Sequence, residues 1–242
     1  YSDEPGSSGL SLMNREALSK AAKIAADAGF QVAVHAIGDR ANREVLDAFE
    51  SVGEGRAKAL RYRIEHAQVV TPEDIPRFAK IGVIASMQPT HATSDMPWAP
   101  ARLGPHRLAG AYAWRSMQKA GAFLVFGSDF PVEEPSPLFG VWAAVSRQDP
   151  TGNPAGGWLP EQRLTLDEAI AGFTTGPAFA AFAEDHRGRI KVGYLADLTV
   201  FDSPLLAERS LLERKAVTVF VGGKIAYGTL PEAAELIESG NK

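Results

Sequence analysis

Two histidines and one aspartate stand where short apolar runs of this sequence end. His35 and His66 are each the last residue of such a run, and Asp129 lies just past the end of a third. If the runs are parallel strands, their carboxyl ends open onto one face of the fold, so we expect the three side chains to lie close together there. Two imidazole nitrogens and a carboxylate oxygen suit a divalent metal ion such as zinc, with one position left for water.

Each of these residues also has a purely structural interpretation. A single histidine after a strand is often only a polar loop residue, and Asp129 could simply cap the next helix. Asp39, at the end of the loop at residues 36–39, is expected either to contact a substrate or orient a neighbouring residue, or else to cap a helix. His91, in a polar loop at residues 88–105, is expected either to bind and polarise a substrate or to be an ordinary loop residue.

The elements that would position these residues alternate along the chain. Apolar runs predict strands, and amphipathic or capped stretches predict helices. The expected strands are residues 30–35, 61–66, 83–87 and 123–126. The expected helices are residues 11–29, 42–51, 71–82, 107–120 and 138–147, followed by a helical pair at 165–182. Such alternation predicts an α/β fold with a parallel sheet and right-handed crossovers.

Two of the helix starts carry specific signals. Thr71 is expected as an N-cap, with Pro72 at the first helical position. Thr165 followed three residues later by Glu168 predicts a capping box. Between the helices expected at 138–147 and 165–182, residues 148–162 are rich in glycine and proline and are expected to form an exposed insertion.

After residue 184 the pattern changes to short strands separated by turn residues. We expect strands within residues 188–193, 197–202 and 216–227, with a hairpin turn at Gly222 and Gly223 and a closing helix at 231–239. The chain therefore divides into an α/β part, residues 1–184, and a small β part, residues 185–242.

Composition excludes several classes of protein. The 242 residues carry 25 Lys and Arg against 29 Asp and Glu, without a block of one sign, so no nucleic-acid or membrane partner is expected. No apolar run reaches the length of about 18 residues that a membrane span needs. The absence of cysteine rules out disulfides, zinc fingers and a thiol nucleophile. With no signal-peptide pattern after Tyr1, the compartment stays open, and the cytoplasm is the default.

Five motifs, taken in order, resemble the metal-dependent amidohydrolase superfamily, in its amidohydrolase family 3 branch of YtcJ-like proteins. They lie at residues 34–41, 64–68, 86–91, 127–132 and 188–202. The resemblance implies the second half of a (β/α)8 barrel, about strands 5–8, in residues 1–184. It also implies part of a small β-sandwich, with a closing helix, in residues 185–242.

The resemblance also implies roles for individual residues. His35 and His66 match the metal ligands after strands 5 and 6, and Asp129 matches the residue after strand 8 that binds metal and acts as the base. His91 would follow strand 7, where the family contributes substrate contacts. The implied activity is hydrolysis of a carbon–nitrogen bond in a small amide or cyclic amide by metal-activated water, with one or two divalent ions, zinc first among them.

The histidine count departs from the family pattern. The family also needs a His-x-His pair after strand 1 and usually a bridging carboxylated lysine or a carboxylate after strand 4. The five histidines, at positions 35, 66, 91, 106 and 186, include no such pair. We therefore expect the C-terminal portion of a longer enzyme, whose N-terminal half is its partner, with homo-oligomerisation left open. The alternative is a non-catalytic fragment or degenerate subunit that needs a partner half-barrel, because an open parallel sheet leaves a strand edge unpaired.

Overall fold

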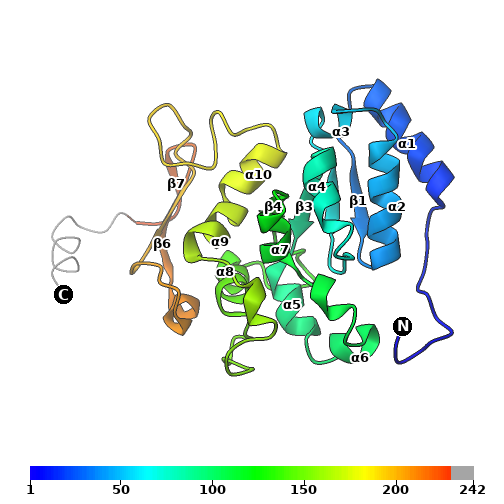
Figure 1. The fold of residues 1–242 in the computed structure, drawn as a ribbon. Helices are drawn as coiled ribbons and strands as arrows, with labels where there is room; N and C mark the ends of the chain where they lie inside the picture. The colour runs from blue at the N-terminus through cyan, green and yellow to red at the C-terminus, as the bar shows by residue number, and fades with distance from the viewer. Residues whose placement is uncertain (230–242) are drawn as a thin grey trace.

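Four parallel strands form the central sheet of the protein (Figure 1). The structure is a computed structural model that describes residues 1–229, and the closing helix predicted at 231–239 lies outside these residues. The strands are β1 (Ala33–Ala36), β2 (Arg63–His66), β3 (Ile84–Met87) and β4 (Phe123–Phe126), and they follow this order across the sheet. Ala36 lies opposite His66, and Met87 lies opposite Phe126. The predicted α/β fold with a parallel sheet is confirmed.

Helices connect the strands and cover the sheet (Figure 1). They are α1 (Arg15–Asp27), α2 (Asp39–Glu50), α3 (Arg56–Ala59), α4 (Ile75–Ile81), α7 (Trp114–Lys119), α9 (Leu166–Phe173) and α10 (Thr175–Ala180). The core includes Phe49 of α2 and Tyr62, both fully buried, whose rings meet edge to face at 4.9 Å. Among the described residues, no helix is both long and apolar enough to cross a membrane.

The segment between β3 and β4 differs most from the prediction. Three short helices occupy it: α5 (Pro89–Asp95), α6 (Ala99–Leu103) and the 3-10 helix η1 (Leu108–Gly110). Residues 88–105 are therefore not a loop, and the helix predicted at 107–120 begins only at α7. The later start has a physical reason at Gly110, whose carbonyl accepts a hydrogen bond from the Val70 N–H. A Cβ on Gly110 would lie 1.7 Å from the Val70 carbonyl oxygen, so two segments of the chain cross closely here, and the Gly110 carbonyl is bonded to Val70 rather than to a later helical N–H.

The two predicted helix starts had different outcomes. Thr71 does not cap α4, because its hydroxyl donates to the buried Asp74 carboxylate at 3.0 Å and residues 71–74 form a turn. That prediction is wrong, and α4 begins at Ile75. At α9 both hydrogen bonds of the capping box between Thr165 and Glu168 are present, so this prediction is confirmed.

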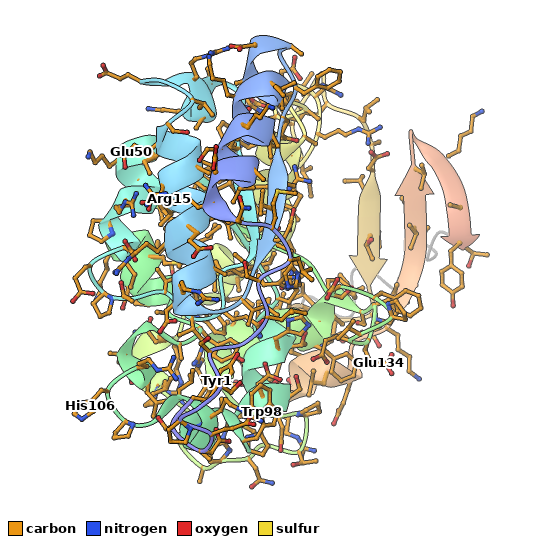
Figure 2. The ribbon with its side chains drawn as sticks, turned by 90° about the vertical axis from the view of Figure 1, so that its right-hand side faces the viewer. Tyr1, Arg15, Glu50, Trp98, His106 and Glu134 are labelled. Atoms are coloured by element: carbon orange, nitrogen blue, oxygen red, sulfur yellow. The ribbon has the colours of Figure 1, made fainter. Side chains whose placement is uncertain are left out.

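Further helices lie at the end of the sheet where the strands finish, in the lower part of Figure 1. Here α8 (Pro137–Ser146) packs against α5 and α9, and the 3-10 helix η2 (Pro160–Gln162) closes the largely exposed segment 148–162. Figure 2 shows Trp98 and His106 at this same end, while Glu50, the last residue of α2, lies toward the other.

A small antiparallel sheet stands beside the α/β part (Figure 2). It consists of β5 (Leu198–Phe201), β6 (Ala216–Val221) and β7 (Lys224–Gly228), and η3 (Arg209–Glu213) connects β5 to β6 and packs against α8. The hairpin turn is confirmed at Gly222 and Gly223, both with positive φ. The strand predicted at 188–193 is wrong. Ile190 and Val192 alternate as in a strand but are 91% and 100% exposed, and no strand of the described chain pairs with them.

Candidate active site

Three histidines and one aspartate gather at the carboxyl end of the parallel sheet. The rings of His35 in β1 and His66 in β2 meet edge to face with their centroids 4.6 Å apart. The ring of His91, from α5, stacks on His66 at 5.7 Å. Its Nε2 lies 3.9 Å from Oδ2 of Asp129, which follows β4. The structure thus brings together residues from four separate segments of the chain.

The backbone turns sharply at two of these positions. His66, Ala67 and Asp129 have φ angles of 78°, 44° and 60°, in the left-handed region that residues other than glycine avoid. Such a conformation costs on the order of 1–3 kcal/mol and persists only where its surroundings fix it. The Ala67 N–H donates to the Ala36 carbonyl at 3.0 Å and anchors the first of these turns. Strain of this kind is common at functional sites.

A buried glutamine determines the tautomer of His66. Oε1 of Gln88 lies 2.8 Å from Nδ1 of His66, and both side chains are buried. In the neutral ring, this contact with an amide oxygen, which only accepts, places the proton on Nδ1 and leaves the lone pair on Nε2. Metal-binding histidines are oriented in this way by a hydrogen bond to their other nitrogen. Gln88 was not among the predicted site residues, although it lies within the motif at residues 86–91.

The surroundings of His35 favour its neutral form. Partial desolvation lowers its pKa below the ordinary value, and repulsion from His66 lowers it further, although Asp129 opposes this. A neutral imidazole is the form that can coordinate a metal ion.

His91 is buried without a partner. It is 7% exposed, and neither ring nitrogen has a hydrogen-bond partner within residues 1–229. Asp129 Oδ2, at 3.9 Å, is beyond hydrogen-bond distance. An unsatisfied buried polar group costs about 1–3 kcal/mol, so the imidazole is a candidate to bind a ligand. His91 lies in the helix α5 and not in the predicted loop, and its role toward substrate stays a prediction.

The cluster fits a divalent metal ion in the chemistry of its donors. Neutral imidazole nitrogens and a carboxylate oxygen are the donors of such sites, and the orphaned nitrogens of His91 show that bonding capacity is left over. In the part of the chain that the structure describes, no three His, Asp or Glu side chains are placed to hold an ion by themselves. The metal-binding roles of His35, His66 and Asp129 therefore stay predictions.

Asp39 belongs to a neighbouring groove. Its Oδ1 accepts from the Arg40 N–H at 2.8 Å, and its Oδ2 accepts from Nη1 of Arg107 at 3.1 Å. Gly38, rather than Asp39, is the N-cap of α2. The groove has a volume of about 270 Å³ and is lined by Asp39, Val69, Val70, Thr71, Pro72, Glu73, His106 and Arg107. The contacts of Asp39 thus tie the start of α2 to the segment after α6, and its role toward substrate stays a prediction.

Two aromatic side chains at this end of the protein are not in the core. Trp98 and Phe130 are 52% and 66% exposed. Phe130 lines a hollow of about 240 Å³ with the residues that follow it, up to Glu134. Apolar surface beside a polar cluster is typical of small-molecule sites.

Comparison with known proteins identifies the family. The sequence profile described as "Amidohydrolase family" matches residues 1–227. The chain is 35% identical over 231 residues to YtcJ of Bacillus subtilis, provisionally named an amidohydrolase, and this match covers 94% of the chain and 43% of that protein. It is 29% identical over 205 residues to an N-substituted formamide deformylase of Arthrobacter pascens, covering 82% of the chain and 37% of that protein.

A solved structure agrees with these matches. An uncharacterised metal-dependent hydrolase from Pyrococcus horikoshii superposes with a TM-score of 0.70 at 34% identity, over 80% of this chain and 38% of that one. The chain spans about two fifths of the length of these three proteins. Because the family profile covers nearly the whole chain and the fold agrees, the chain belongs to the amidohydrolase family.

Proposed function

We propose that the protein containing this chain hydrolyses a carbon–nitrogen bond in a small amide or cyclic amide, with a divalent metal ion, zinc, as its cofactor. The observation that carries the proposal is the meeting of His35, His66, His91 and Asp129 at one end of the parallel sheet. Two relatives support it, since one is named as a formamide deformylase and the other as a metal-dependent hydrolase.

His35, His66 and Asp129 would hold the ion. When bound, a divalent metal lowers the pKa of a water molecule toward 7 and polarises a substrate carbonyl. The two histidines offer imidazole nitrogens for this purpose. Gln88 keeps the His66 ring in the tautomer that leaves Nε2 free.

Asp129 and His91 would handle the proton and the substrate. The Asp129 carboxylate takes a proton from the attacking water and delivers it to the leaving nitrogen, first as general base and then as general acid. His91 has unpaired nitrogens that can hydrogen-bond to the reacting group. Asp39, at the edge of the groove beside Arg107, is placed to contact a more distant part of the substrate.

We further propose that β1–β4 are strands 5–8 of a (β/α)8 barrel. Within the described chain, β1 pairs only with β2 and β4 only with β3, so each has an open edge. Large apolar side chains are exposed at Phe30 and Ile37, on either side of β1 in the sequence, and at Phe123 in β4. The N-terminal half of the same protein would pair with both edges and supply the remaining metal ligands.

The second candidate is a non-catalytic subunit. The observation in its favour is that the described residues hold no complete group of metal ligands. Such a chain would still need a partner half-barrel to cover its open strand edges.

Metal analysis of the full-length protein, with a panel of amides and lactams, tests the proposal. We expect a bound divalent metal and hydrolysis of at least one compound, and we expect His35→Ala to lose both. His186→Ala is the matched control, because His186 is exposed and hydrogen-bonds Asp185, outside the cluster. A metal-free protein without hydrolysis would favour the non-catalytic subunit.

A further inference from the structure

Gln68, Asp95 and Tyr112 form a closed triangle of hydrogen bonds beside the histidines. The Tyr112 hydroxyl donates to Oδ2 of Asp95. Nε2 of Gln68 donates to the same oxygen at 2.9 Å and to the hydroxyl oxygen at 3.1 Å. Gln68 and Tyr112 are buried, and Asp95 is half-buried. A network of buried hydrogen bonds in a low dielectric makes the parts that it joins more rigid.

The triangle joins the segment that carries His66 to the helix that carries His91. Gln68 stands two residues after His66, in the turn that leaves β2. Asp95 stands four residues after His91, at the end of α5, and positions separated by four lie on the same face of a helix. Any displacement of α5 relative to that turn must therefore break hydrogen bonds of the triangle.

Tyr112 is fixed from two sides. Its N–H donates to the Gln68 carbonyl at 2.6 Å, and its own carbonyl accepts from Nη1 of the buried Arg147 at 3.0 Å. Burial, and then the hydrogen bond to Asp95, raises the pKa of the Tyr112 hydroxyl far above its ordinary value. The hydroxyl therefore keeps its proton and remains a donor.

Both histidines need such external support. His66 has a left-handed backbone, as does the residue after it. The ring nitrogens of His91 have no hydrogen-bond partner in residues 1–229, and seven-residue helices such as α5 are not stable without tertiary contacts. Gln88 ties the start of α5 to His66, and the triangle ties the end of α5 to the turn after His66.

We propose that Gln68, Asp95 and Tyr112 are positioning residues that hold His91 against His66 in the arrangement used for hydrolysis. That this arrangement serves hydrolysis rests on the proposed function. The arrangement itself can be tested without any substrate.

The first test compares two Tyr→Phe variants of the full-length protein, stripped of metal. Tyr112→Phe removes the hydroxyl of the triangle and keeps the ring. Tyr62→Phe is the matched control, since it removes a buried hydroxyl that donates to the Ala22 carbonyl at 3.0 Å, outside the cluster. The measurement is the rate at which diethyl pyrocarbonate modifies His91 and His66, followed by mass spectrometry of the peptides.

We expect Tyr112→Phe to raise the modification rate of His91 by about fivefold, because the loss of one hydrogen bond makes local opening of the structure easier by about this factor. We expect Tyr62→Phe to leave the modification rate of His91 unchanged. An unchanged rate in Tyr112→Phe, or an equal rise in both variants, overturns the inference.

The second test uses an amide that the panel shows to be hydrolysed. Tyr112→Phe should lower kcat by about tenfold and change KM by less than about twofold, because misplaced groups raise the barrier more than they weaken binding. Asp95→Asn, whose amide oxygen can still accept both bonds, should retain more kcat than Asp95→Ala. A raised KM with an intact kcat contradicts the positioning role. If nothing is hydrolysed and no metal binds, the proposed function fails, and the modification rates alone decide the inference.

Discussion

Replacing Glu168 by Gln should destabilise the protein at neutral pH and much less in acid. The Glu168 carboxylate accepts two hydrogen bonds from Arg115, from Nη1 at 2.9 Å and from Nη2 at 2.7 Å. Its Oε2 also accepts from the Thr165 N–H at 2.7 Å, as part of the capping box. The contact joins α7 to the first turn of α9. Bidentate bonds between charged groups are among the strongest in proteins, and Gln can offer only one uncharged oxygen.

The pKa of Glu168 sets the magnitude. The hydrogen bonds from Arg115 lower this pKa from 4.5 to about 2. Partial desolvation opposes the shift, and the hydrogen bonds from Thr165 add to it. One unit corresponds to about 1.4 kcal/mol, so the charged form contributes at most about 3 kcal/mol to the free energy of unfolding. The side chain is 29% exposed, and solvent screening reduces the contribution to about 1–2 kcal/mol. Because the pKa is lowered, this stability is complete above the unfolded-state value of 4.5 and is lost as pH falls toward 2.

Thermal unfolding of the full-length protein and its variants at neutral pH and at about pH 3 measures the effect. For Glu168→Gln we expect a Tm several degrees below that of the wild type at neutral pH, and a smaller difference in acid. Asp167→Asn is the control, because Asp167 is an exposed acid in the same helical turn and does not contact Arg115. An equal loss of Tm by Glu168→Gln at both pH values would refute the electrostatic reasoning.

Substitutions at the site and at a close chain crossing have distinct expected effects. Asp129→Asn should reduce metal content modestly and lower kcat by about 10²–10⁴-fold, because the amide cannot accept a proton. If it keeps more than about a tenth of kcat, Asp129 is not the base. His35→Ala should lose metal and activity together, as element analysis and an amide assay would show. Gly110→Ala should lower the free energy of unfolding in urea by about 1–3 kcal/mol, because its Cβ would meet the Val70 carbonyl. Gly127→Ala should have little effect on the free energy of unfolding, because there is open space around Gly127. Equal losses of unfolding free energy in the two glycine variants would contradict the steric argument.

The convergence of the histidines could be predicted because local pattern and one general rule determine it. Short apolar runs that end in His35 and His66 gave the strands, and parallel strands finish at one edge. The capping box at Thr165 was equally local, since both of its partners lie within four residues. The chemical roles of the clustered residues are a different matter and await the experiments above.

The parts that the sequence did not predict depend on contacts between distant segments. The helices α5 and α6 have only seven and five residues, so no clear helical period marks them, and packing against other elements decides their structure. Residues 188–193 have a strand pattern, but a strand forms only by pairing, and the described chain offers them no partner. Tyr112 and Gln68 are 44 residues apart, and no spacing rule connects them.

The distribution of unsatisfied polar atoms favours a ligand site over an incidental cluster of histidines. Eight buried side-chain atoms in the described chain have no hydrogen-bond partner, and three of them belong to Thr90 and His91, adjacent in α5. Each such atom costs about 1–3 kcal/mol, and the left-handed backbone at His66 and Asp129 adds a similar cost at the same edge of the sheet. Around them, Gln88, Gln68, Asp95 and Tyr112 are hydrogen-bonded to one another or to His66. Unpaired groups held inside a well-paired frame have bonding capacity for a bound molecule, and this is the property that an active site requires.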